Sequence, residues 1–229
     1  MTCIAIIPAR GGSKGIPRKN LAEINGRSLV VLAINAALQS GVINSVLVTS
    51  DDTSILEVAE KSGAIAIRRP AELATDSAAI EDALIHAINQ YSLSYPEPQV
   101  VVLLQPTSPL RKASTISRAL QVFNENGCTG SVYGVTECEH HPFKSLIVNG
   151  NTLSPVREVE DLSRSRQTLP RAFRQSGSIY VVSSKEFQNS HSLFNHPVQW
   201  IEVDQDEALD IDTVSDLETA RQIARNLDV

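Results

Sequence analysis

The sequence predicts an α/β fold, a Rossmann-like and mostly parallel sheet with helices on both faces. Short apolar runs alternate with amphipathic stretches through the first two thirds of the 229 residues, and such alternation is typical of consecutive β-α units. The first apolar run, Cys3–Pro8, ends in a glycine-rich loop, as a buried parallel strand does. Hydrophobic residues make up 42% of the chain, which is ample for the core of such a sheet.

Each predicted element has its own signal. Strands are predicted at short apolar runs, namely 3–8, 45–49, 64–67, 100–104, 178–182 and 200–203. Helices are predicted where apolar residues recur every three or four positions between a capping residue and a glycine or asparagine, namely 28–40, 53–62, 80–91 and 116–123. Thr213 caps a last helix, whose apolar side is formed by Leu217, Ala220, Ala224 and Leu227.

The alternation is interrupted at about 137–176. This stretch holds strand fragments, the turn Asn149-Gly150-Asn151 and an arginine-rich segment from Arg157 to Arg174. We therefore expect a single domain over 1–229 with a small inserted subdomain at about 137–176.

The bulk properties exclude several classes of function. A formal net charge of −6 argues against nucleic acid as the main partner, because binding to a phosphate backbone needs a basic face. The apolar runs are too short for a bilayer span, and the N-terminus enters a strand rather than a signal peptide, so no membrane association is expected. Cys3, Cys128 and Cys138 are odd in number and lack metal-ligand spacing. We expect reduced thiols in a cytoplasmic protein.

The loop 8–20 carries the strongest chemical signal. Its basic residues are Arg10, Lys14, Arg18 and Lys19, and they alternate with Gly11, Gly12 and Gly15. Glycines let backbone N–H groups turn toward an anion, so at the carboxyl end of a strand this loop indicates a polyphosphate site. The loop matches neither the dinucleotide fingerprint nor the Walker pattern, which disfavours a nicotinamide-dependent oxidoreductase. A solvated basic loop is the plainer alternative.

Asp210 and Asp212 form a second candidate site. In an extended segment their spacing places both carboxylates on one face, where they repel unless a cation lies between them. Mg²⁺ is usually held by one or two carboxylates together with substrate phosphates. We therefore expect a magnesium site at this pair. The alternative is that Asp212 or Thr213 only caps the last helix, with Asp216 completing a capping box.

Five stretches together resemble the CMP-N-acetylneuraminate (CMP-sialic acid) synthetases and related nonulosonate cytidylyltransferases. They are the loop 8–20, Arg69-Pro70 with Ala74-Thr-Asp-Ser77, Leu104-Gln-Pro-Thr-Ser-Pro-Leu-Arg111, Ser165-Arg-Gln-Thr-Leu-Pro170, and Asp210-Ile-Asp-Thr213. The resemblance implies a nucleotidyltransferase that transfers CMP from CTP to the anomeric hydroxyl of a nonulosonic acid, N-acetylneuraminate or a close relative, and releases pyrophosphate. The same chemistry on a legionaminic, pseudaminic or Kdo-type acid is the alternative. The two aspartates disfavour a non-catalytic nucleotide-sugar-binding protein.

The resemblance also implies roles for individual residues. Catalytic roles are implied for Arg10, Lys14, Lys19 and Asp212, and metal binding for Asp210 and Asp212. Nucleotide contacts are implied for Ala9, Arg10, Asn20, Arg69 and Ser77. Sugar contacts are implied for Gln105, Thr107, Ser108, Lys144, Arg166, Gln167 and Tyr180. In the family the insertion is a dimerisation subdomain that reaches the partner's site, so a homodimer with shared active sites is expected.

Plainer structural roles stay open for several of these residues. Ser77 can cap a helix that begins near Ala78, and the hydroxyls of 105–108 can cap the next helix. The arginine-rich stretch can be a surface arm without a catalytic role. The chain also has Gln175-Ser-Gly177 where the family pattern has Pro-Asn-Gly, so the identity of the sugar stays open.

Overall fold

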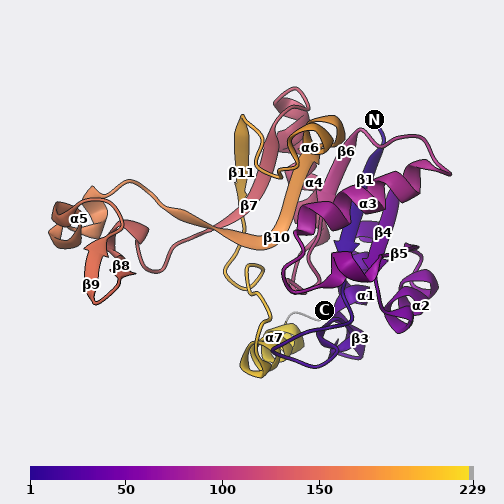
Figure 1. The fold of residues 1–229 in the computed structure, drawn as a ribbon, viewed down its shortest axis with the longest axis horizontal. Helices are drawn as coiled ribbons and strands as arrows, with labels where there is room; N and C mark the ends of the chain where they lie inside the picture. Colours follow the sequence, from indigo (N-terminus) through magenta and orange to yellow (C-terminus); the bar gives the residue numbers. More distant parts are fainter. Residues whose placement is uncertain (227–229) are drawn as a thin grey trace.

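A computed structural model describes residues 1–226 and contains a central sheet of seven strands (Figure 1). The strands are β1 (Cys3–Pro8), β4 (Ser45–Ser50), β5 (Ile65–Arg68), β6 (Val100–Leu103), β7 (Ser131–Glu137), β10 (Phe173–Ser183) and β11 (Val198–Glu202). Their order is β11-β7-β10-β6-β1-β4-β5. All neighbours are parallel except at β10, which is antiparallel to both β6 and β7. The predicted mostly parallel sheet is confirmed.

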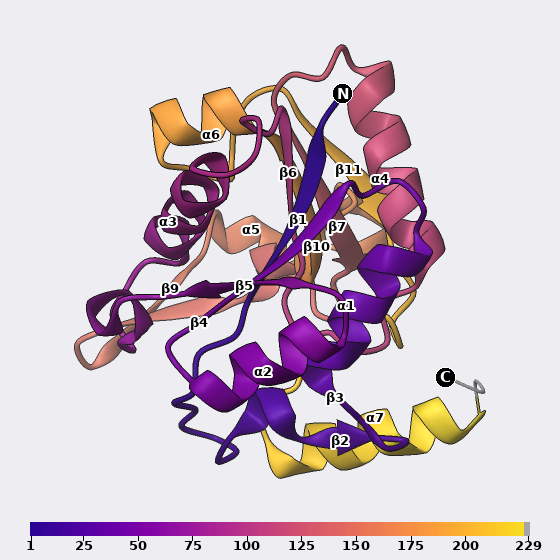
Figure 2. The same cartoon turned by 90° about the vertical axis from the view of Figure 1, so that its right-hand side faces the viewer.

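Helices cover both faces of this sheet (Figure 2). One face carries α1 (Leu29–Gln39), α2 (Thr53–Lys61) and α4 (Ala113–Glu125), and the other carries α3 (Ile80–Ser92) and α6 (Ser184–Ser190). Among residues 1–226, no helix combines the length and the apolar content that crossing a membrane requires.

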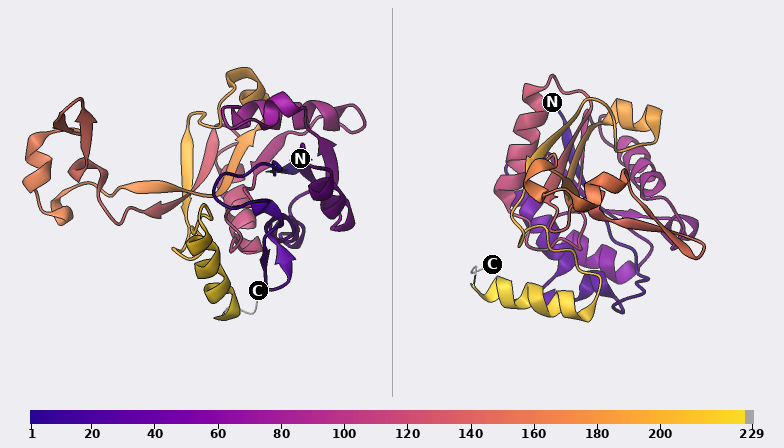
Figure 3. Two further views of the ribbon diagram at one scale, coloured as in Figure 1. Left: turned by 60° about the horizontal axis from the view of Figure 1, so that its bottom comes forward. Right: turned by 90° about the vertical axis from the view of Figure 1, so that its left-hand side faces the viewer.

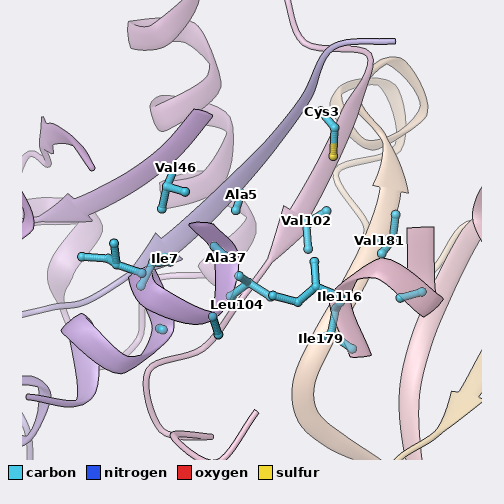
Figure 4. Close-up of a cluster of buried hydrophobic side chains, with 14 of the residues drawn as sticks. Cys3, Ala5, Ile7, Ala37, Val46, Val102, Leu104, Ile116, Ile179 and Val181 are labelled. Carbon is cyan, nitrogen blue, oxygen red and sulfur yellow. The ribbon is translucent and has the colours of Figure 1, made fainter. Parts of the chain in front are cut away.

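The side chains of β1 alternate between two hydrophobic cores, because successive residues of a strand point to opposite faces. Cys3, Ala5 and Ile7 lie in the core under α1 and α4 (Figure 4). Ile4 and Ile6 lie in the core under α3. All five side chains are buried. Burial on both faces explains why the sequence of β1 is an unbroken apolar run and not an alternating one.

The last helix, α7 (Val214–Asn226), lies beside the short hairpin of β2 (Glu23–Ile24) and β3 (Arg27–Ser28) (Figure 2). Its buried residues are Leu217, Ala220 and Ala224, as predicted. Ile16 of the glycine-rich loop packs into the same core. Leu227, predicted on this side of the helix, lies outside the described residues. The third core therefore joins the C-terminal helix to the loop.

The parallel strands bring distant segments to one edge of the sheet. The chain crosses from β1 to β4 and β5 on one side, and then returns to β6 on the other side of β1. Such a reversal of strand order leaves a crevice at the carboxyl ends of the strands, where open α/β sheets bind ligands.

Between β7 and β10, residues 138–172 leave the sheet as an arm that projects from the body (Figures 1 and 3). The arm contains the hairpin of β8 (Leu146–Asn149) and β9 (Thr152–Pro155), closed at the predicted 149–151 turn, and the short helix α5 (Val159–Ser163).

The arm is organised around one carboxylate. Asp161 accepts from Arg157 Nε at 2.7 Å and lies 3.3 Å from Arg164 Nη1. Asp161 has no exposed surface, although the arm is thin, because the two arginine side chains cover it. The hydrogen bonds from Arg157 and Arg164 lower the pKa of Asp161, and the bond from Arg157 has the larger effect. The dimerisation role expected for this region stays a prediction.

Candidate active site

A cavity of about 330 Å³ lies at the carboxyl edge of the parallel strands. Its lining comes from four segments, namely the glycine-rich loop after β1, the segment after β5, the turn after β6 and the chain before α7. The volume is within the range of small-molecule sites. The cavity therefore occupies the position that the strand order favours for a ligand.

Two cations of the loop share one carboxylate in this cavity. Arg10 Nη1 lies 2.7 Å from Oδ1 of Asp76, and Lys14 Nζ lies 2.9 Å from Oδ2. The hydrogen bonds from Lys14 and Arg10 lower the pKa of Asp76. Asp76 lies within one of the family-like stretches, but its ion pairs could not be predicted from the sequence, because pairs between distant segments leave no local pattern.

Lys19 joins the loop to the chain before α7. Its Nζ donates to the carbonyl oxygen of Ile211 at 2.6 Å and lies 3.0 Å from Oδ1 of Asp212. Only 14% of the Lys19 side chain is exposed, so this pair is partly shielded from water. Gly15 packs on the same segment, since a Cβ there would come closer than 3.0 Å to the carbonyl oxygen of Asp212. The loop is thus packed on Ile211 and Asp212, one of the two predicted metal ligands.

The first part of the loop is held by hydrogen bonds to its backbone. Asn20 lines the cavity, but its Nδ2 donates to the carbonyl oxygen of Arg10 at 2.8 Å. The N–H of Gly11 donates to Oδ1 of Asp51 at 2.9 Å. Ala9, a predicted nucleotide contact, is fully buried and is not among the residues that line the cavity. Asn20 and Asp51 therefore position the loop.

Arg69 enters the cavity from the segment after β5 although its side chain is almost fully buried. Its guanidinium donates to the carbonyl oxygens of Thr49 at 2.9 Å and Leu73 at 3.2 Å. Desolvation lowers the pKa of Arg69. These two hydrogen bonds to backbone carbonyls hold the guanidinium of Arg69 in place.

Ser77 does not line the cavity. The side chain is exposed, and its hydroxyl lies 3.4 Å from that of Thr75. The helix that it was expected to cap begins later, at Ile80, after Ala79 at the N-cap. Ile80 and Ala79 line the cavity instead. The structure thus does not place Ser77 at the N-cap of α3, and its contact with the nucleotide stays a prediction.

The turn after β6 contributes Gln105 and Thr107 to the cavity. The carbonyl oxygen of Thr107 accepts from the N–H of Ile211 at 2.8 Å, and its side chain hydrogen-bonds Asp210. Ser108 is fully buried and does not line the cavity. The turn is thereby tied to the same segment as the loop.

Arg111 supports this turn from inside the protein, a role that the sequence did not reveal. Its buried guanidinium donates from Nη2 to the carbonyl oxygen of Gln105 at 2.7 Å and from Nε to that of Ser178. Desolvation lowers the pKa of Arg111 to about 10, and the charge of Glu207 opposes this shift. Arg111 is therefore still protonated at neutral pH and links the turn to β10.

The two aspartates face different spaces. Asp212 lines the cavity, whereas Asp210 lines a second hollow beside Arg174 and Thr136. They still interact, because desolvation and then the charge of Asp212 raise the pKa of Asp210. The Asp210 side chain has solvent-exposed surface, but neighbouring protein atoms shield one side of its carboxylate from water and so desolvate it.

The predicted capping box is present and does not use the carboxylates of Asp210 and Asp212. Asp216 accepts from the N–H groups of Asp212 at 3.1 Å and Thr213 at 2.7 Å. Its own N–H donates to Thr213 Oγ1 at 3.3 Å. The carboxylate of Asp212 takes no part in this cap, so capping and metal binding are not exclusive alternatives here.

The remaining predicted sugar contacts do not line this cavity. Lys144 donates to the carbonyl oxygens of Leu162, at 3.1 Å, and Arg164, while Arg166 donates to that of Glu139 at 3.0 Å, all within the arm. Gln167 lines a separate hollow at the base of the arm. Tyr180 is buried in β10, and its hydroxyl donates to Gln175 Oε1 at 3.2 Å.

A family model described as cytidylyltransferase matches residues 4–228. The chain belongs to the cytidylyltransferase family. The chain is 31% identical to the N-acylneuraminate cytidylyltransferase of Streptococcus agalactiae, over 94% of this chain and 52% of that protein. It is 31% identical to the pseudaminic acid cytidylyltransferase of Campylobacter jejuni, over 96% and 95% of the two chains. It is 33% identical to the CMP-N,N'-diacetyllegionaminic acid synthase of Legionella pneumophila, over 94% of this chain and 93% of that protein.

The chain thus spans about half the length of the N-acylneuraminate cytidylyltransferases that it matches. Among solved structures, a CMP:2-keto-3-deoxy-manno-octonic acid synthetase complexed with CTP has a TM-score of 0.73 at 18% identity, with 99% of each chain covered. A 4-diphosphocytidyl-2C-methyl-D-erythritol synthase from Anaerococcus prevotii has a TM-score of 0.65 at 13% identity, with 98% of each covered. These two likenesses confirm the fold.

Proposed function

We propose that this cytidylyltransferase transfers CMP from CTP to the anomeric hydroxyl of a nonulosonic acid and releases pyrophosphate. The observation that carries the proposal is the cavity in which Arg10, Lys14 and Lys19 converge beside Asp212. Curated relatives named for N-acylneuraminate, pseudaminic and legionaminic acids support the substrate class.

The reaction requires charge stabilisation more than covalent work. The sugar oxygen forms a bond to the α-phosphorus, the bond from that phosphorus to the oxygen bridging the β-phosphate breaks, and the hydroxyl proton departs. Negative charge accumulates on the leaving pyrophosphate, where prepositioned cations lower the barrier. Arg10 and Lys14 are proposed to hold the leaving group, and Lys19 to hold the phosphates nearest Asp212. Arg69 is proposed to contact the base.

Magnesium is proposed between Asp212, which lines the cavity, and Asp210, which lines the second hollow. Carboxylate oxygens are the donors that Mg²⁺ prefers. Desolvation first, and then the negative charge of Asp212, raise the pKa of Asp210, and a cation beside the pair would relieve the repulsion between the two charges. Within residues 1–226, no group of three or more His, Cys, Asp or Glu side chains is placed to hold a metal, so phosphate oxygens and water would complete the coordination. The ion would stabilise phosphate charge and lower the pKa of the sugar hydroxyl.

A homodimer with shared sites is proposed because the arm carries both exposed apolar residues and predicted sugar contacts. The exposed apolar residues include Ile147, Val148, Leu153 and Val159. An apolar surface of this kind on a projecting element is typical of an interface. In the proposed dimer, the arm of one protomer would bring Lys144, Arg166 and Gln167 to the cavity of its partner.

Light scattering with a matched pair of variants tests the dimer. Val148→Asp, on the arm, should yield monomers with reduced turnover, whereas Leu93→Asp, equally apolar and exposed at the end of α3, should stay dimeric and active. Monomeric Val148→Asp protein with undiminished turnover would rule out shared sites.

A cytoplasmic location is also proposed. Cys3, Cys128 and Cys138 are all free thiols, the state that a reducing compartment favours. Burial raises the pKa of Cys3 to about 12, so this thiol is unreactive and structural.

The activity is tested by pyrophosphate release. The purified protein is incubated with Mg²⁺, each of the four nucleoside triphosphates and a panel of eight- and nine-carbon keto acids. Release is expected with CTP and one or more nine-carbon acids, and release with the eight-carbon acid alone would select the Kdo alternative. Asp212→Asn should lose most of the activity. The absence of release in every reaction would contradict the enzymatic function.

A further inference from the structure

Asp76 uses both of its carboxylate oxygens on cations that the proposed reaction needs for phosphate. Oδ1 pairs with Arg10 at 2.7 Å and Oδ2 with Lys14 at 2.9 Å. Two oxygens held by a guanidinium and an ammonium reproduce the way in which a phosphate group is bound. About half of the Asp76 side chain is exposed, so it can swing into solvent without disturbing a core.

Other carboxylates near the loop have different tasks. Asp51 accepts a backbone N–H from Gly11 at 2.9 Å, at a place where the loop packs closely on the neighbouring Asp52. Asp212 pairs with Lys19, whose Nζ is also held by a backbone carbonyl. Asp51 therefore shapes the loop, and Asp212 belongs to the proposed metal site. Asp76, in contrast, forms its two recorded ion pairs with the loop cations Arg10 and Lys14.

Arg10, Lys14 and Asp76 all line the same cavity. A triphosphate that reached the two cations would meet the Asp76 carboxylate at contact distance, where like charges repel strongly. The carboxylate and the phosphate oxygens consequently exclude each other from the same two cations.

We propose that Asp76 is an internal competitor of phosphate, which holds Arg10 and Lys14 in place between turnovers, withdraws when CTP binds and returns as pyrophosphate leaves. This inference rests on the proposed function, because it assigns the two cations to the triphosphate. Asp76 thereby tunes affinity for phosphate-bearing ligands: it weakens the binding of CTP and pyrophosphate together and leaves recognition of the base unaffected.

Removing the charge of Asp76 measures this competition. Asp76→Asn should bind CTP and inorganic pyrophosphate about threefold to tenfold more tightly than the wild type, the range expected for releasing two partly exposed ion pairs. The affinity for cytidine, which has no phosphate, should be unchanged. In turnover, inhibition by pyrophosphate should strengthen by the same factor as binding.

The experiment is isothermal titration calorimetry of the full chain with CTP, pyrophosphate and cytidine, accompanied by thermal melts. Asp82→Asn is the matched control, because it removes one negative charge from an exposed position in the first turn of α3 and should leave all three affinities unchanged. Weaker binding of CTP and pyrophosphate by Asp76→Asn would overturn the proposal, since Asp76 would then assist the phosphates. Equal tightening by Asp82→Asn would also overturn it, by showing an effect of net charge alone.

Failure of this inference is distinguishable from failure of the proposed function. If wild-type protein releases pyrophosphate from CTP and a keto acid while Asp76→Asn shows unchanged affinities, the reaction stands and the competition is wrong. If the wild type binds neither CTP nor pyrophosphate, the assignment of the cavity itself is wrong.

Discussion

Replacing Gly15 with alanine should separate the loop from Asp212 and remove most of the activity. A Cβ on Gly15 would come closer than 3.0 Å to the carbonyl oxygen of Asp212, which is backbone and cannot rotate away. The two backbones must therefore move apart by roughly an ångström, an overpacking that costs about 1–3 kcal/mol where it cannot relax. A displacement of about 1 Å at a positioned group can reduce the rate on the order of 100-fold. We expect kcat/KM for CTP to fall by that factor.

Gly12→Ala is the matched control, because an added Cβ at Gly12 has no atom within 4 Å. Initial rates of pyrophosphate release and urea denaturation are measured for both variants. Gly12→Ala should keep kcat/KM within about threefold of the wild type, as expected for an exposed substitution without new contacts. If Gly15→Ala is as active as Gly12→Ala, the packing of the loop on Asp212 does not position the reacting groups. If both lose activity equally, loop flexibility and not this contact is responsible.

Three further predictions concern residues around the site. Asp52 caps α2 by accepting from Ser54 N at 2.7 Å and Ile55 N at 3.2 Å, so Asp52→Ala should lower the free energy of unfolding in urea by about 1 kcal/mol, whereas Asp52→Asn should change it little. The pKa of Asp210 is raised in the fold, so ionised Asp210 destabilises the protein, and this penalty disappears as the pH falls through the raised pKa. In an NMR titration, Asp212→Asn should move the pKa of Asp210 toward its ordinary value. An unmoved pKa would show that desolvation alone raises it. Arg111→Met should lower the free energy of unfolding by about 2–5 kcal/mol, because it leaves the carbonyl oxygens of Gln105 and Ser178 without their donors, and a loss below about 1 kcal/mol would show that water replaces the guanidinium.

The parallel half of the sheet could be predicted because its strands are buried on both faces. Val100–Leu103 is apolar at every position, and all four residues are buried. The half that leads into the arm gave a weaker signal. β10 begins at Phe173, five residues before the predicted strand. Its first residues are not predicted as strand because Arg174 and Gln175 are polar and exposed, and they pair only with β7. The polar helix α6, from Ser184, buries only Ser184 and Phe187 and has no apolar repeat to reveal it.

The chemistry of the loop could likewise be read from local composition, whereas its partners could not. Lys19 and Asp212 are separated by 193 residues, and only the strand order brings them together. Arg111 illustrates a second obstacle. An arginine in a polar turn looks solvent-exposed in the sequence, and its burial becomes visible only when Ser178 of β10 is placed beside it.

The side of the cavity that is proposed to bind the triphosphate and the arm that is predicted to reach the sugar belong to different parts of the structure. Lys19 and Gly15 contact the chain before α7, as does Thr107, a predicted sugar contact, so the proposed triphosphate side draws its residues from one chain. The bulge of β10 lies against the turn after β6, because a Cβ on Gly177 would lie 3.1 Å from Gln105 Oε1 and 3.4 Å from Ser108 Oγ. Relatives named for three different acids share nearly the same identity with this chain, 31 to 33%. Overall similarity therefore does not select the sugar, and we expect exchanges confined to 175–177 and to the arm to change it without altering the affinity for CTP.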